Sequence, residues 1–160
     1  MAKTAAEQGV TPSLLDRLID PESAGTQSRR GYGIEQMVAV VRRDLEELLN
    51  TRLGTIYLPA EYPELHTSPL AFGLPDFGSV KTASPQSRQA IGNSIEQIIE
   101  RFEPRLVDVR VLLVSDPRGA DQLAVRFQIE AKMRIAPFPD VSFETIMELT
   151  TGSASVRETR

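Results

Sequence analysis

The chain has 160 residues, of which 41% are hydrophobic and 25% charged, and this composition is ordinary for one globular domain with short tails. Its net charge of −4 argues against a nucleic-acid-binding protein, which normally carries a basic stripe. The absence of cysteine excludes disulfides and thiolate metal sites. Residues 1–10 lack the apolar core of a signal peptide and no segment reaches transmembrane length, so we expect a cytoplasmic protein.

The first 33 residues predict a flexible N-terminal arm. Residues 1–10 and 20–33 are small and polar, which is typical of linkers. Between them, Pro12 and Pro21 bracket a short helix near residues 13–19. The helix carries an apolar stripe made of Leu14, Leu15, Leu18 and Ile19. A helix this short is marginal in water, so the stripe must pack either on its own domain or in a partner groove.

Two long helices are predicted next. Over residues 34–50, Ile34, Val38, Val41, Leu45 and Leu48 share one face. Residues 51–83 read as an irregular span whose apolar part, residues 70–77, should lie over the core. The second helix runs from Pro85 to about Phe102, and we expect its buried face to consist of Ile91, Ile95, Ile98 and Phe102.

Strand-like patterns occupy the rest of the chain. Residues 106–114 are rich in valine and leucine, and residues 123–135 and 141–149 alternate between apolar and polar. Helices followed by an antiparallel meander predict an α+β domain over residues 34–150. We expect two long helices packed on one face of a sheet of about three to four strands, with residues 151–160 as a loose tail.

A rigid corner separates the second helix from the first strand. Pro104 cannot continue a helix, so the helix should end near Glu103 and leave an acid and a base on either side of the proline. Two interpretations remain open from the spacing alone. The corner holds two opposite charges in a fixed position for docking, or Glu103 and Arg105 form an exposed ion pair worth about 0–1 kcal/mol.

Residues suited to catalysis are sparse. His66 is the only histidine, and no glycine-rich phosphate loop follows a strand. Glu96, Glu100 and Glu103 lie mainly away from the apolar face of their helix, so we interpret them as solvated. A glycosidase needs two carboxyl groups with different environments, and the pattern singles out no such pair. We therefore expect no catalytic residue, no metal site and no cofactor.

Four segments together resemble a known family. The chain is similar to the lysozyme-like family of phage-tail baseplate wedge proteins, and within it to the type VI secretion baseplate subunits called TssE. The resemblance extends over about residues 11–150 and depends on residues 13–18, 41–52, 73–77 and 102–106. The Leu-Leu-Asp-Arg-Leu segment at residues 14–18 favours the secretion branch over the phage-tail branch.

The resemblance implies a non-enzymatic subunit of a six-fold baseplate that starts polymerisation of the contractile sheath. It implies sheath docking by Glu103, Pro104 and Arg105. It also implies binding of other wedge subunits through the short helix, by Leu14, Leu15, Arg17, Leu18 and Ile19. A sheath strand could add to an open edge of the sheet, with Glu103 and Arg105 aligning the first ring. The alternatives are a phage-tail wedge protein, a peptidoglycan-active glycoside hydrolase and a small regulatory anti-adaptor.

Overall fold

The computed structural model describes residues 13–19, 32–54, 58–77, 85–114, 124–148 and 151–159. The chain divides into two compact units, Met1–Val41 and Arg42–Arg160. Residues 1–10 and most of the expected linker lie outside the described residues.

The first unit contains the short helix α1 (Leu14–Ile19), at the place predicted from the sequence. Ser13 caps it, because its hydroxyl oxygen accepts a hydrogen bond of 3.1 Å from the backbone N–H of Asp16. The same hydroxyl donates to the Asp16 carboxylate. This reciprocal pair compensates in part for the low intrinsic stability of a six-residue helix.

Helix α2 (Ile34–Asn50) begins in the first unit and ends in the second. The predicted apolar face is largely confirmed, since Val38, Val41, Leu45 and Leu48 are buried. Ile34 differs, because it lies in the first turn and is 40% exposed.

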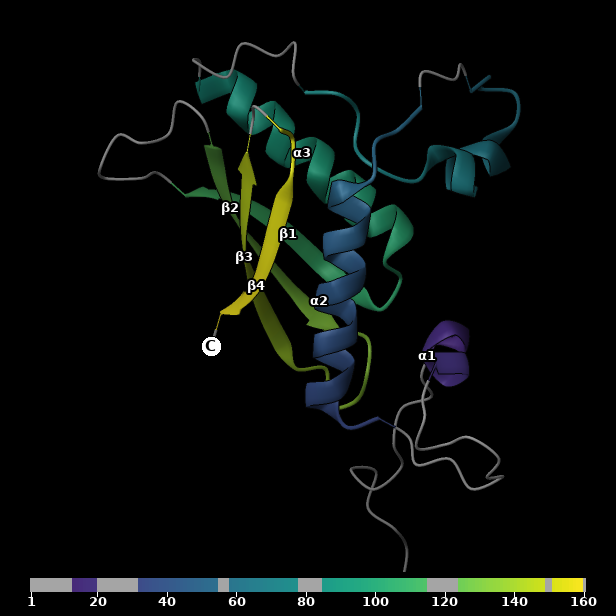
Figure 1. Cartoon of the computed structure of the whole chain (residues 1–160), viewed down its shortest axis with the longest axis vertical. Helices are drawn as coiled ribbons and strands as arrows, with labels where there is room; N and C mark the ends of the chain where they lie inside the picture. Colours follow the sequence, from purple (N-terminus) through teal and green to yellow (C-terminus); the bar gives the residue numbers. More distant parts are fainter. Residues whose placement is uncertain are drawn as a thin grey trace, which may run out of the picture. The chain divides into compact units, whose positions relative to one another are not determined.

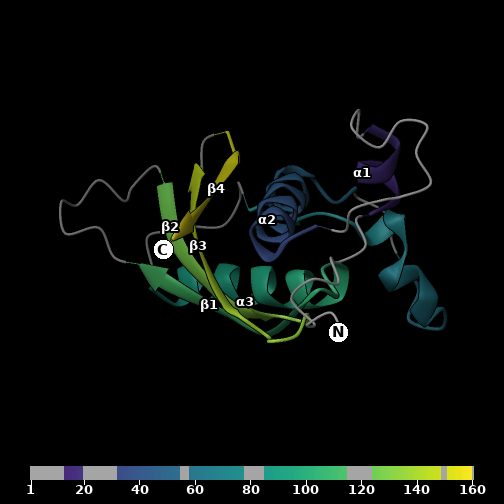
Figure 2. The same ribbon diagram turned by 90° about the horizontal axis from the view of Figure 1, so that it is seen from below.

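Helix α3 (Pro85–Phe102) lies against β1 (Leu106–Val114), as Figures 1 and 2 both show. Ile91, Ile95 and Ile99 are its fully buried residues, and Ile98 is only partly buried. The prediction of Ile98 was therefore wrong by one position. Successive steps of four residues keep side chains in one row along a helix, and Ile99 continues the row of Ile91 and Ile95.

The second unit contains one antiparallel sheet with the strand order β1-β2-β3-β4. The other strands are β2 (Ala124–Met133), β3 (Asp140–Glu148) and β4 (Ala154–Thr159). Together with α2 and α3, these four strands confirm the α+β class. The inner face of the sheet is apolar, with Val111, Phe127, Ile129, Met133, Phe143 and Met147 buried.

Strand β4 corrects the expected loose tail. Its register pairs Val156 with Thr145 and Ala154 with Met147 on β3. Ala154 and Val156 are buried, whereas Arg157, Glu158 and Thr159 are exposed. Only two side chains of β4 enter the core. The strand is therefore short and mostly polar, and its sequence lacks the clear alternation of apolar and polar residues that predicts a strand.

The irregular span after α2 is held by backbone hydrogen bonds. Leu53 N–H donates to the Leu74 carbonyl and Leu74 N–H donates to the Thr51 carbonyl, both at 2.8 Å. Two short 3-10 helices, η2 (Pro63–Thr67) and η3 (Pro69–Ala71), precede this contact. Leu74 and Phe77 are buried, as expected for the apolar part of the span, but Leu70 is 50% exposed.

Candidate docking site at the corner between α3 and β1

The predicted corner is present, and backbone hydrogen bonds hold it on both sides of Pro104. Glu103 N–H donates to the Ile99 carbonyl at 2.8 Å, which makes the last helical bond of α3. Leu106 N–H donates to the Glu103 carbonyl at 3.1 Å, and the Arg105 carbonyl accepts from Arg134 N–H at 2.7 Å. Pro104, at the apex, is exposed. The corner is therefore a defined turn between two packed elements.

A chain of charged side chains fixes Arg105. Its Nε donates to Glu103 Oε1 at 2.6 Å, and its Nη2 donates both to the second Glu103 oxygen and, at 2.6 Å, to Asp44 Oδ2. Asp44 Oδ1 in turn accepts from Arg43 Nη2 at 2.7 Å. We call these four residues the charge cluster: Arg43, Asp44, Glu103 and Arg105. Two acids and two bases leave it formally neutral.

The charge cluster is partly removed from water. Glu103 is only 4% exposed, while the Arg105 side chain is 27% exposed. Burial lowers the pKa of Arg105, but hydrogen bonds and attraction from Glu103 and Asp44 outweigh this, and its pKa is raised above the ordinary value. Arg105 is therefore permanently charged.

The sequence-based interpretation of Glu103 as a solvated side chain was wrong. Helical spacing places Glu103 away from the apolar row of α3. Its carboxylate nevertheless binds Arg105, and the same guanidinium binds Asp44 on α2. Glu96 also differs from a solvated charge, because its Oε2 accepts a hydrogen bond of 2.9 Å from the backbone N–H of Val111. Neither contact follows from a period along one helix.

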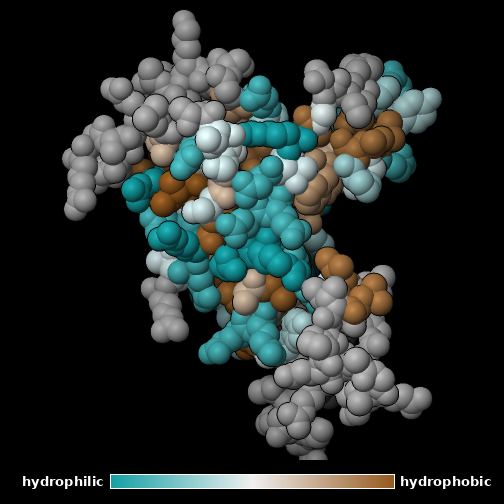
Figure 3. Space-filling model, in the orientation of Figure 1, coloured by the Kyte–Doolittle hydropathy of each residue, from teal (hydrophilic) through white to brown (hydrophobic). Residues whose placement is uncertain are grey.

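The second predicted site lies in α1, within the other unit. Leu15 is 56% exposed and Leu18 is 74% exposed. Figure 3 shows hydrophobic surface over α1 and also over the η2–η3 segment, where Tyr62 and Leu70 are exposed. The side chains of Leu14, Arg17 and Ile19 lie outside the described residues.

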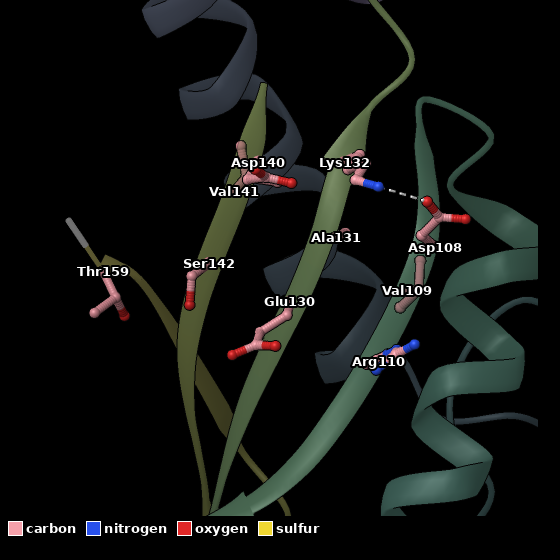
Figure 4. Close-up of a pocket in the computed structure, with 10 residues that line it drawn as sticks. All are labelled: Asp108, Val109, Arg110, Glu130, Ala131, Lys132, Asp140, Val141, Ser142 and Thr159. Carbon is pink, nitrogen blue, oxygen red and sulfur yellow. Dashed lines mark hydrogen bonds and ion pairs between the residues drawn. The ribbon is translucent and has the colours of Figure 1, made fainter. Parts of the chain in front are cut away.

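A hollow on the outer face of the sheet was not predicted (Figure 4). It is lined by charged side chains of neighbouring strands, among them Arg110 and Glu130, and Lys132 pairs with Asp108 at 3.1 Å. The only sequence signal for this hollow was the alternation of charged residues along residues 126–134. Such alternation shows which side of one strand faces outward, but it does not show which strands lie next to it.

The described part of the chain offers little for other kinds of site. Its histidine and carboxylate side chains form no group of three or more that could hold a metal ion. None of its helices combines the length and hydrophobicity needed to cross a membrane.

Comparison with known proteins decides the family. The model of the family described as baseplate wedge protein gp25 matches residues 35–137, which include both α2 and the corner. The chain belongs to this family. Membership in the baseplate wedge family assigns it a structural role in a baseplate, in contact with other baseplate subunits.

Among solved structures, a chain in "The baseplate complex from the type VI secretion system" is similar to this wedge protein at 15% sequence identity and a TM-score of 0.47. The match covers 79% of the wedge protein and 96% of that chain. No curated protein matches the sequence. Helix α1 and strands β3 and β4 lie outside the region matched by the family model.

Proposed function

We propose that this baseplate wedge protein is a non-enzymatic subunit of a type VI secretion baseplate, in the manner of TssE subunits. In this role it binds other wedge subunits through α1 and docks the first ring of the contractile sheath at the Glu103–Pro104–Arg105 corner, so that the sheath starts to polymerise. A six-fold arrangement of the subunit within a cytoplasmic baseplate is part of the proposal.

The observation that carries the sheath-docking proposal is the preorganised Arg105 guanidinium. Two carboxylates hold it through Nε and Nη2, and among the described residues no acceptor bonds its Nη1. The guanidinium is partly exposed beside the exposed Pro104. A side chain already fixed in place loses little conformational entropy on binding, which favours affinity. Glu103, being buried, acts as the positioning residue for Arg105.

Exposed leucines support the second half of the proposal. Leu15 and Leu18 are three positions apart on α1, so they lie on neighbouring parts of one face. An amphipathic helix that keeps such residues in water is suited to a hydrophobic groove of a partner. Helix α1 is too short to be stable by itself, and a groove would stabilise it.

The test of the corner is a co-expression pull-down with contractile sheath and wedge proteins from the same organism. Arg105→Gln should lose sheath capture while still capturing wedge subunits. Arg43→Gln is the matched control, because Arg43 belongs to the charge cluster but does not bond Glu103, and it should capture sheath like the wild type. Equal capture by all three proteins would remove the corner from the proposed site.

The same experiment tests α1. Leu15→Asp with Leu18→Asp changes side chains that are mostly in water, so the folded state should be retained. We expect this variant to lose the wedge subunits and keep the sheath. If this variant lost both the wedge subunits and the sheath, the proposal that they bind two separate surfaces would be contradicted.

The proposal excludes a glycoside hydrolase. The buried carboxylate that could supply a general acid, Glu103, is bonded by a permanently charged arginine, and Glu96 accepts a backbone N–H. Peptidoglycan clearing by the purified protein, abolished by Glu103→Gln, would reverse this conclusion.

We also propose that α2 and α3 cover the same face of the sheet.

A further inference from the structure

The hollow on the outer face of the sheet has no part in the proposed docking at the corner or through α1. It has a volume of about 740 Å³, and residues of all four strands line it. The strand register places one lining residue of each strand in a single row across the sheet: Arg110, Glu130, Ser142 and Thr159. The row carries a base, an acid and two hydroxyl groups, so it can recognise a partner by charge and by hydrogen bonds.

The base and the acid of this row do not bind each other. Arg110 and Glu130 are direct cross-strand partners, an arrangement in which opposite charges usually attract. Figure 4 shows instead that the Glu130 carboxylate is turned toward β3, and it accepts a hydrogen bond of 3.2 Å from Gln128. Among the described residues, no acceptor bonds the Arg110 guanidinium and no cation binds Glu130. Both charges are therefore available to a partner.

A bulge in β1 separates Arg110 from the nearest acid on its own strand. The register shifts between Val107 and Arg110, and Asp108, which lies between them, has a φ of +54°. Bulges redirect the side chains of a strand, and the Asp108 carboxylate accepts a hydrogen bond of 3.1 Å from Lys132. Asp108 thus binds Lys132 and not Arg110.

The charges that line the hollow are of both signs. They comprise three acids and two bases: Asp108, Glu130, Asp140, Arg110 and Lys132. A ligand of a single charge sign would be attracted to one part of the hollow and repelled by another. A partner that carries an acid and a base side by side satisfies the hollow better.

The shape of the hollow favours a helix as the partner element. A second copy of the chain paired through the same face would set one hollow against another and leave space without van der Waals contacts. A helix is convex, and residues three or four positions apart on it have Cβ atoms about 5–6 Å apart. Directly opposed residues of neighbouring strands, as Arg110 and Glu130 are, have Cβ atoms about 4.5–5.5 Å apart. The two spacings match.

We infer that the hollow accepts a helix of another baseplate wedge subunit that carries an acidic and a basic residue three or four positions apart. The acid binds Arg110 and the base binds Glu130. The inference rests on the proposed role as a wedge subunit, and it adds a binding surface on the sheet to the two surfaces proposed above. The Gln128 amide, which also donates to Ser142 at 3.2 Å, holds Glu130 in place, so little conformational entropy is lost on binding.

The first experiment measures the affinity of each purified wedge subunit for variants with a reversed charge in the hollow. Arg110→Glu and Glu130→Lys each set like charges against the partner helix, and we expect each to weaken binding of one wedge subunit about tenfold or more. Arg157→Glu and Glu158→Lys are the matched controls, because both residues are exposed on β4 and lie outside the hollow. They should bind within about twofold of the wild type.

A second variant tests shape without a change of charge. Ser142→Tyr places a ring in the hollow, and it should also weaken binding of the same wedge subunit about tenfold or more. Ser155→Tyr is its control, since Ser155 is a half-buried serine of β4 outside the hollow. Melting temperatures identify any variant that is not folded, and the folded variants among the three decide the result.

The outcomes separate this inference from the proposed function. Capture of wedge subunits that is equal in the wild type and in the hollow variants would overturn the inference and leave the proposed function standing. Loss of sheath binding alone in these variants would also overturn it, as would a wild-type dimer that the same substitutions dissociate. Absence of wedge capture by the wild type would overturn both.

Discussion

Arg105, at the start of β1, donates a 2.6 Å hydrogen bond to Asp44 on α2, 61 positions earlier in the chain. The same guanidinium binds Glu103 at the end of α3. One side chain thus connects both long helices to the first strand. The corner is a structural joint of the domain as well as the proposed docking element, and experiments on it must separate the two roles.

The stability of this joint should depend on Arg105. Arg105→Met leaves the Glu103 carboxylate buried without its partner, and we expect the free energy of unfolding to fall by about 2–3 kcal/mol, less than for a fully buried pair because Arg105 is 27% exposed. Urea unfolding measures the change. Lys132→Met breaks the exposed pair with Asp108 and should stay within about 0.5 kcal/mol. Equal losses in the two variants would contradict a buried pair.

The contribution of Arg105 should not change with moderately alkaline pH. Its pKa is raised on folding, so its stabilisation is fully present below the strongly alkaline pKa that arginine has in the unfolded state, and is lost only as the pH rises through the still higher folded-state pKa. The stability difference between the wild type and Arg105→Met should therefore be equal at pH 7 and pH 10. Unfolding curves at both values test this, and a difference that shrinks at pH 10 would contradict it.

Gly73 should be intolerant of any side chain. Its φ is +112°, and a Cβ atom there would lie 2.6 Å from the Thr51 backbone oxygen. We expect Gly73→Ala to cost about 2 kcal/mol or more. Gly92→Ala is the control, since its Cβ would meet Phe127 at 3.5 Å and α3 would gain about 0.5–1 kcal/mol of helix propensity. Thermal unfolding should separate the two variants in opposite directions.

Asn50 should stabilise the β4 edge. Its side chain takes part in three hydrogen bonds, one with the Glu46 carbonyl and two with the backbone of Ala154. Asn50→Ala should lower stability by about 1–3 kcal/mol and speed amide exchange at Ala154. Thr51→Val removes an exposed bond to the Glu47 carbonyl and should leave exchange at Ala154 unchanged. Unaltered exchange in Asn50→Ala would show that the amide does not protect this edge.

Thr145 offers a stabilising substitution. It is fully buried on β3, and its hydroxyl has no hydrogen-bond partner among the described residues. Thr145→Val keeps the shape and removes the unsatisfied group, so we expect about 1 kcal/mol of added stability. Thr145→Ser keeps the hydroxyl and loses a methyl group, which should cost about 1 kcal/mol. A destabilised valine variant would indicate that the hydroxyl is satisfied.

Local pattern was sufficient for much of the fold. Period-four rows of apolar residues located α2 and α3, the proline at position 104 located the end of α3, and valine-rich and alternating stretches located β1, β2 and β3. These features depend on residues close together in the chain, so their signal is present in the sequence. The family resemblance used the same local segments, and the match over residues 35–137 confirmed it.

The sequence by itself therefore determined the α+β class, the position of the corner and the wedge family. Only the tertiary structure decided that Glu103 is buried, that Asp44 holds Arg105 and that residues 154–159 form a fourth strand. Each of these depends on contacts between distant segments, and no period along one element specifies which distant side chain will complete a hydrogen bond or exclude water.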